Sequence, residues 1–282
     1  MTIAACGFLT HMNKPSNRLR QPLVGGNSKW IFVVLSGILF ALFAVPLAAV
    51  VLRSISPEFF TNALSTQALK ALSLSLVTSS ITMIIAAIFG TPLAYVLAHW
   101  KFKYKSWIEL ILDLPIVLPP SVAGLALLIA FGRNGYFGPA LNVLGISLPF
   151  TTAAVVIAQT FVAAPLYVRS ARIGFSGVER QLIESAHVEG ASQWQLFSEV
   201  MIPLTSRILA SGAILTWTRA LGEFGATILF AGNLEGTTQT MPIAIYVGFE
   251  QNLGVALVLS VVLIFVSAIV LMVTKKLEQR EY

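Results

Sequence analysis

Charged residues are scarce in this chain of 282 residues: Asp, Glu, Lys and Arg make up 11% of it, whereas hydrophobic residues make up 56%. A soluble domain carries about 25% charged residues. Such a composition leaves too little polar surface to cover a water-exposed globule, so we expect lipid to be part of the solvent. The net charge of +6 does not indicate nucleic-acid binding, because the basic residues are scattered between apolar runs instead of forming one basic face.

Residues that build metal sites and catalytic sites are also rare. The single cysteine, Cys6, excludes an internal disulfide and a cysteine-based zinc cluster. The three histidines, His11, His99 and His187, lie on separate segments and predict no metal site. The phosphate-binding sequence G-x-x-x-x-G-K-[ST] does not occur, which excludes ATP hydrolysis by a P-loop. We therefore predict a protein that is not an enzyme and that needs no cofactor.

Long apolar runs predict an all-α integral membrane protein. A run of about 18 or more apolar residues can cross a bilayer as a helix, and six such runs can be drawn. They leave a basic N-terminal tail at residues 1–29, a transmembrane domain at residues 30–274 and a C-terminal tail at residues 275–282. The predicted spans are Trp30–Leu52, Ala71–Ala98, Ile108–Phe131, Thr151–Ala171, Ile208–Phe230 and Leu253–Val273.

The distribution of basic residues predicts the orientation. With the N-terminus in the cytoplasm, 14 of the 18 Lys and Arg residues fall in cytoplasmic segments. Of the remaining four, Arg53, Lys70 and Arg133 fall in segments on the opposite side of the membrane, and Arg219 lies within a span. Because basic residues concentrate on the cytoplasmic side of membrane proteins, both termini are predicted to be cytoplasmic.

A polar interruption at residues 177–204 separates the fourth and fifth spans. Its charged side chains, which include Glu184 and Glu189, are too costly for the bilayer centre. Its apolar residues recur at helical spacing, with Leu182, Ile183 and Ala186 as the first of them. We therefore predict a helical surface element in the cytoplasm that is available to a partner.

Two patterns concern helix packing in the second and third spans. Small residues recur every four positions from Thr78 to Ala98 and predict a face that another helix approaches closely. The third span contains Pro115, Pro119 and Pro120, which remove backbone donors and predict a kink or a break near its cytoplasmic end. The break either faces a water-filled cavity or only shapes the bundle.

The fifth span carries the most informative polar groups. Arg219 and Glu223 are four residues apart and are expected on one helical face, with Thr216 and Thr227 nearby. Polar side chains in a span seldom face lipid. These four residues either line a translocation path, where the cation suits an anion, or form a neutral pair that holds helices together.

Three classes of membrane protein compete at this point. An ion-coupled secondary transporter commonly has several mid-membrane carboxylates and repeated halves, whereas this chain has one mid-span Glu and no evident repeat. A membrane scaffold needs no Glu-rich cytoplasmic segment, and nothing orders the serines into a membrane enzyme.

The polar interruption resembles the EAA motif of the membrane subunits of bacterial ABC importers. Glu184, Ser185 and Ala186 are followed by His187, by Glu189 with Gly190, and later by Ile202 with Pro203. Ser185 replaces an Ala of the family pattern, and the Ile-Pro-Leu ending matches it only approximately. The resemblance implies a type I ABC importer permease fold in which these residues form a coupling helix on an ATPase subunit.

Segments beyond the motif are similar to molybdate permease subunits. They are LPIVLPPSVAGLALLIAFGRNGYFG at 114–138, FVAAPLYVRSARIGF at 161–175, RALGEFGATILFAGN at 219–233 and TTQTMPIAIY at 237–246. Sulfate permeases share the proline-rich and GEFGA segments, and tungstate importers are not distinguished. The resemblance implies a homodimer in the bacterial inner membrane, with an ABC ATPase dimer and an extracytoplasmic oxyanion-binding protein as partners.

Overall fold

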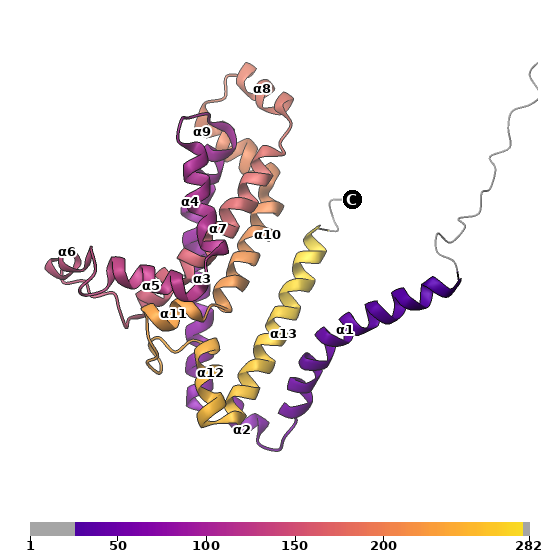
Figure 1. Cartoon of the computed structure of the whole chain (residues 1–282). Coiled ribbons are helices and arrows are strands. Elements are labelled where there is room, and N and C mark those ends of the chain that lie inside the picture. The colour runs from indigo at the N-terminus through magenta and orange to yellow at the C-terminus, as the bar shows by residue number, and fades with distance from the viewer. Residues whose placement is uncertain (1–25, 279–282) are drawn as a thin grey trace, which may run out of the picture. The chain divides into compact units, whose positions relative to one another are not determined.

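The structure, a computed structural model, describes residues 26–278, so that Cys6, His11 and most of the predicted basic tail lie outside the described residues (Figure 1). Two compact units are distinguished, one up to Ala49 and one from Val50 onward. The described residues form helices and connecting segments without a strand. The helices are α1 Gly26–Ser54, α2 Phe59–Ala63, α3 Thr66–His99, α4 Lys105–Val117, α5 Pro120–Phe131, α6 Gly138–Val143, α7 Thr152–Ser176, α8 Arg180–Val188, α9 Gln193–Gln195, the π-helix η1 Leu196–Met201, α10 Ile202–Leu221, α11 Gly225–Phe230, α12 Met241–Gln251 and α13 Leu253–Glu278.

The predicted all-α membrane fold is confirmed. Five helical stretches are long and apolar enough to cross a membrane, and α4 with α5 makes a sixth if this bent pair counts as one span. The two helices of the pair are inclined at 118°. The predicted proline break therefore lies at Leu118 and Pro119, near the middle of the predicted span Ile108–Phe131, because α4 continues through Pro115. The last span also extends beyond its predicted bounds, because α13 continues through Lys275 and Lys276 into the predicted C-terminal tail.

The fifth span differs from the prediction at both ends. Helical structure begins at Gln193, where Ser192 forms a reciprocal capping box with Gln195, and it continues through η1 and α10 to Leu221. The chain then leaves the helix at Gly222 and starts the short helix α11 at Gly225. The predicted bounds of this span, Ile208–Phe230, were wrong, because they overlooked the break at Gly222 in the apolar run.

Helices α3, α7 and α10 pack together as the centre of the second unit. The small-residue face of α3 is buried, as predicted, from Thr78 to Ala94. A Cβ at Gly90 would lie 2.8 Å from the Tyr167 ring, and a Cβ at Gly212 would lie 2.8 Å from Cβ of Ser170. Backbones that approach this closely pack by van der Waals contact, which drives helix association in lipid.

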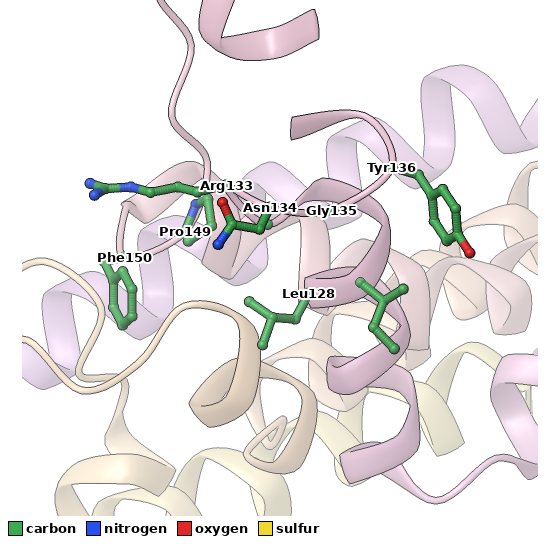
Figure 2. Close-up of a pocket in the computed structure, with 9 residues that line it drawn as sticks. Leu128, Arg133, Asn134, Gly135, Tyr136, Pro149 and Phe150 are labelled. Carbon is green, nitrogen blue, oxygen red and sulfur yellow. The ribbon is translucent and has the colours of Figure 1, made fainter. Parts of the chain in front are cut away.

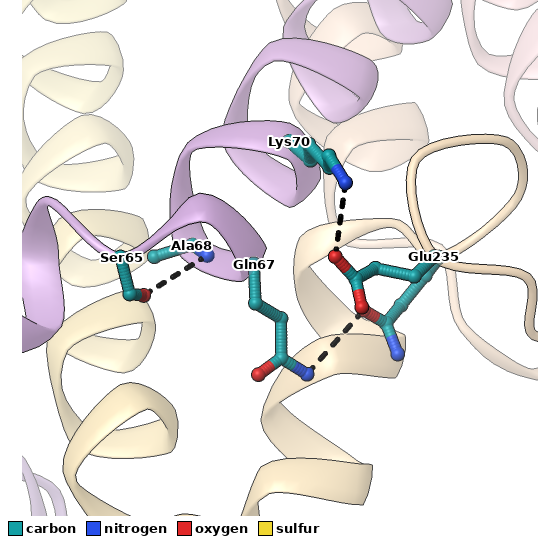
Figure 3. A network of polar contacts seen from close by, with 6 residues as sticks. Ser65, Gln67, Ala68, Lys70 and Glu235 are labelled. Carbon is teal, nitrogen blue, oxygen red and sulfur yellow. Dashed lines mark hydrogen bonds and ion pairs between the residues drawn. The ribbon is translucent and has the colours of Figure 1, made fainter.

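The bundle has two distinct ends (Figure 1). Helices α8 and α9 lie at one end, which we call the α8 end, and α12 lies at the other, which we call the α12 end. Here Ser75 Oγ accepts a hydrogen bond of 2.7 Å from the Met241 amide at the start of α12. Lys70 Nζ lies 3.2 Å from Glu235 Oε1. Figure 3 shows this contact and places Gln67 beside the same loop. The segment MPIAIY thus begins a helix that packs on α3 and α13.

We expect Gly90→Ala to destabilise the bundle by about 1–3 kcal/mol, because the added methyl overpacks against the Tyr167 ring. The ring has little freedom to move, since its hydroxyl lies 2.6 Å from Thr91 Oγ1. Gly37→Ala is the control: no described heavy atom lies within 4 Å of its Cβ position, so only the helix propensity of Ala, about 1 kcal/mol in favour of folding, remains. Unfolding in detergent, followed by circular dichroism, measures both; equal stabilities would contradict the expected clash.

Candidate functional site

Two breaks in membrane helices meet at what we call the broken-helix site, which consists of Pro120, Gly124, Arg219, Glu223 and Gly225. Glu223 is its buried charge, with 1% of its side chain exposed. One carboxylate oxygen accepts a hydrogen bond of 2.6 Å from Arg219 Nη1, and the other accepts one of 2.9 Å from the Ala226 amide at the start of α11. A buried carboxylate is tolerated only when paired and hydrogen-bonded, so the arginine and the break stabilise the same group.

The glycines of the broken-helix site permit close contact between α5 and α11. A Cβ at Gly124 would lie 2.8 Å from the carbonyl oxygen of Ala226. A Cβ at Gly225 would lie 2.8 Å from Cβ of Pro120, the first residue of α5. Each short helix therefore covers the other where the backbone leaves its regular path. Neither α5, with 12 residues, nor α11, with six, could cross a hydrocarbon core of about 30 Å alone.

The four residues predicted for a translocation path differ in exposure. Arg219 keeps 34% of its side chain exposed and thus borders the protein surface, whereas Glu223 lies beneath it. Thr216 and Thr227 are fully buried, and their hydroxyl oxygens have no hydrogen-bond partner among the described residues. The exposed positions of the two breaks include Gly222 and, where α5 faces Gly225, Pro120 and Ser121. The site thus presents one cation and two interrupted backbones on a helical surface.

The predicted coupling segment forms a helical hairpin at the α8 end. Helix α8 ends in a reverse turn in which Gly190 has a φ of +85°. The Ala191 amide donates to the Ala186 carbonyl and the Gly190 amide donates to the His187 carbonyl, both at 3.0 Å. This pair of bonds defines a Schellman motif, which favours glycine at the left-handed position. The predicted bend between two helical pieces therefore lies at Gly190.

Most of the predicted coupling residues share an exposed surface. Glu184, Ser185, His187, Glu189 and Gly190 are exposed, as is Pro203 at the start of α10, while Ala186 and Ile202 are half-buried. Glu184 forms an ion pair of 2.7 Å with Arg180 one turn earlier in α8. With 60% of its side chain exposed, Glu184 remains accessible. Helix α8 buries none of its residues fully, which is unusual for a helix in a packed bundle.

Aromatic side chains attach the hairpin to the bundle. The Phe197 ring in η1 lies 5.0 Å from the Tyr95 ring of α3 and 6.3 Å from the Phe175 ring of α7. Tyr95 and Phe175 are in edge contact at 5.7 Å. Aromatic pairs at such distances stabilise beyond the area that they bury. The hairpin is therefore exposed on its α8 side and held to the bundle on its η1 side.

A pocket of about 660 Å³, which the sequence analysis did not predict, lies at the far end of α5. Figure 2 shows Arg133 and Phe150 on one side, Tyr136 on the other and Leu128 between them. Phe150 has a φ of +64°, uncommon for a bulky residue, and a Cβ at Gly232 would lie 2.7 Å from its ring. One residue that could have pointed to this region in the sequence is Gly232, whose positive φ of 76° suits glycine.

Comparison with known proteins identifies the family of this chain and several of its relatives. Residues 90–281 match the family described as binding-protein-dependent transport system inner membrane component. The probable transport system permease protein NifC of Clostridium pasteurianum is 37% identical over 246 residues, which cover 87% of this chain and 86% of that protein. The molybdenum transport system permease protein ModB of Mycobacterium tuberculosis is 37% identical over 247 residues, which cover 86% of this chain and 92% of that protein.

Solved structures show the same fold. A chain of a bacterial ABC transporter that imports the acidic polysaccharide alginate superposes with a TM-score of 0.69 at 16% identity, covering 90% of this chain and 96% of that one. A chain of the methionine ABC transporter MetNI gives a TM-score of 0.54 at 17% identity, covering 77% and 99%. The type I ABC importer permease fold expected from the resemblance is confirmed, and the chain belongs to the family of binding-protein-dependent transport system inner membrane components.

Proposed function

We propose that this chain is the membrane-spanning subunit of an ATP-driven importer for molybdate. The observation that carries the proposal is the 37% identity with a molybdenum transport permease over 86% of the chain, a length that includes both the coupling segment and the broken-helix site. Tungstate is the alternative, because a permease of Thermococcus kodakarensis named for molybdate and tungstate transport is 36% identical over 204 residues. Both are tetrahedral dianions of similar size.

Arg219 is the residue that we assign to the anion. Its guanidinium has five N–H donors, and the bond to Glu223 Oε2 occupies one of them. A partly exposed arginine within an apolar bundle is costly toward lipid, so we infer that its exposed part faces a water-filled path. The neutral Arg219–Glu223 pair keeps the cation oriented, while Thr216 and Thr227 reach the path only after the helices around them move.

A second copy of the chain completes the path in this proposal. The broken-helix site reaches the surface of one chain at Arg219, which is partly exposed, and at Pro120, which is exposed at the start of α5. Interrupted backbone at membrane depth is tolerated where protein or a water-filled cavity covers it. A symmetric homodimer would cover the site and bring two Arg219 side chains to one axis, which suits a dianion.

ATP-derived work enters from a separate ATPase dimer, since the sequence has no P-loop. The exposed surface of α8 and its Gly190 turn are the proposed contact. Closure of the ATPase dimer would move both hairpins and convert the bundle pair from inward-open to outward-open, a shift between two global states. In this proposal an extracytoplasmic binding protein delivers the oxyanion, and the chain lies in the bacterial inner membrane. Both termini are then cytoplasmic, because basic residues concentrate on the cytoplasmic side.

The anion contact predicts that uptake of molybdate at limiting concentration falls about tenfold or more when Arg219 loses its charge, because a hydrogen bond to a charged group contributes about 1.5–3 kcal/mol. Arg219→Gln alone leaves Glu223 buried without its cation, at a cost of about 3–5 kcal/mol. The test therefore uses Arg219→Gln combined with Glu223→Gln, in which two amides replace the two charges.

Uptake is measured in proteoliposomes that contain the complete transporter and its binding protein. Lys70→Gln is the control, since it removes an exposed cation at the α12 end and is expected to leave uptake unchanged. Wild-type uptake by the double variant would show that Arg219 and Glu223 only hold helices together.

The ATPase contact predicts that Gly190→Ala weakens association with the ATPase subunit about 5- to 30-fold, since a left-handed conformation costs an L-residue about 1–2 kcal/mol. Gly145→Ala is a matched control, because Gly145 has a φ of +72° and, like Gly190, has no described heavy atom within 4 Å of its Cβ position. Co-purification of the ATPase with each variant gives the comparison. Equal losses from both variants would point to general destabilisation and against a contact at α8.

A further inference from the structure

Four charged side chains meet between α4 and α7, away from both sites described above. Glu109 and Asp113 lie one turn apart on α4, and Arg169 and Arg172 lie on α7. All four line one small cavity. Arg172 Nη1 lies 2.8 Å from Glu109 Oε1, which makes this pair a direct polar link between two helices that also pack through apolar residues. The sequence alone suggested only that these arginines mark the cytoplasmic boundary.

The Glu109–Arg172 pair is better shielded from water than two other ion pairs of the described residues. Its side chains are 28% and 30% exposed, compared with 49% and 50% for Lys70 and Glu235. The Arg180–Glu184 pair is more exposed still. Exposed pairs contribute little because water and salt screen them. A partly buried pair between two helices is therefore the one whose loss should change how the helices move together.

The pair connects the two sites through the chain itself. Three positions beyond Ser176, the last residue of α7, the chain reaches Glu179 and the start of α8. Helix α4 leads to the break at Leu118 and to α5, which packs on α11 in the broken-helix site. Arg172 lies in the last turns of α7, and Glu109 lies in the second turn of α4. The pair thus joins the helix that enters the coupling segment to the helix that precedes the break.

Loose packing lies at the opposite end of α4. A groove of about 290 Å³ separates parts of α3, α4 and α7 there, and Pro115, Pro165, Phe89 and Phe161 line it. Both prolines lie inside their helices and remove a backbone hydrogen bond. Helix α4 is therefore held by an ion pair near the α8 end and has free space beside it near the break.

We propose that Arg172 and Glu109 are positioning residues that make α4 follow the motion of α7, so that displacement of the coupling hairpin reaches the broken-helix site. The inference rests on the proposed function, since it assigns how ATP-driven motion arrives at the path. Without the pair, α7 moves while α4 stays, and ATP is hydrolysed without transport.

Charge exchange tests the pair. The complete transporter is reconstituted with Glu109→Gln, Arg172→Gln, or Glu109→Arg combined with Arg172→Glu, and molybdate uptake is divided by the ATP hydrolysed in the same vesicles. We expect each single variant to lower this ratio about tenfold, the effect of one charge-assisted hydrogen bond on a two-state equilibrium. The exchanged pair should recover most of the wild-type ratio of uptake to ATP hydrolysis. The control exchanges an ion pair at the α12 end, with Lys70→Glu combined with Glu235→Lys, and we expect it to keep the wild-type ratio.

The ratio of molybdate uptake to ATP hydrolysis distinguishes a loss of coupling from a loss of stability. If the single variants assemble poorly, the exchanged pair decides: recovery of assembly without recovery of the ratio contradicts the proposal. Single variants with wild-type ratios also overturn it, as does an exchanged pair as defective as the single variants. If wild-type vesicles hydrolyse ATP but take up no molybdate, the proposed function has failed instead, and that result is distinguishable because it precedes any substitution.

Discussion

A backbone polar group in hydrocarbon must find a partner within the protein, and the architecture depends on how two interrupted spans meet this requirement. At the first break, the Pro119 carbonyl accepts from the amides of Val122 and Ala123. At the second, the Glu223 carboxylate accepts from the Ala226 amide. That carboxylate needs a cation, which makes Arg219 necessary, and the two short helices need contact, which makes Gly124 and Gly225 necessary. One requirement thus selects a charge pair and two glycines.

At the α8 end, in contrast, polar side chains remain exposed. Helix α8 keeps Glu184, His187 and Glu189 exposed, and its turn at Gly190 is closed by backbone hydrogen bonds instead of packing. The hairpin is nevertheless not loose, because Phe197 packs on the rings of Tyr95 and Phe175. A surface that is open on one side and anchored on the other can receive a partner and pass its displacement to the bundle.

The sequence was sufficient for features that depend on composition and local pattern. Apolar length predicted the spans, four-residue spacing predicted the buried face of α3, and a glycine among helix formers predicted the turn at Gly190. Features that depend on contact between distant segments were not accessible. The break after Leu221 is stabilised by the Ala226 amide bond to Glu223 and by the facing α5. Gly222 and Gly225 were its only local signals in the run, and without a proline they did not distinguish a break from close helix packing. Likewise, Arg172 is indistinguishable in sequence from a boundary arginine until α4 places Glu109 beside it.

The tight packing of α3, α7 and α10 has a consequence for the timescales of motion. Local opening is most costly where buried contacts are densest, and exposed elements open at little cost. Amides near Gly90 and Gly212 should therefore exchange with solvent deuterium over hours, whereas those of α8 exchange within a much shorter time. The centre of the bundle is therefore expected to exchange its amide hydrogens slowly and α8 to exchange them rapidly. Amide exchange can follow the two regions separately during a transport cycle.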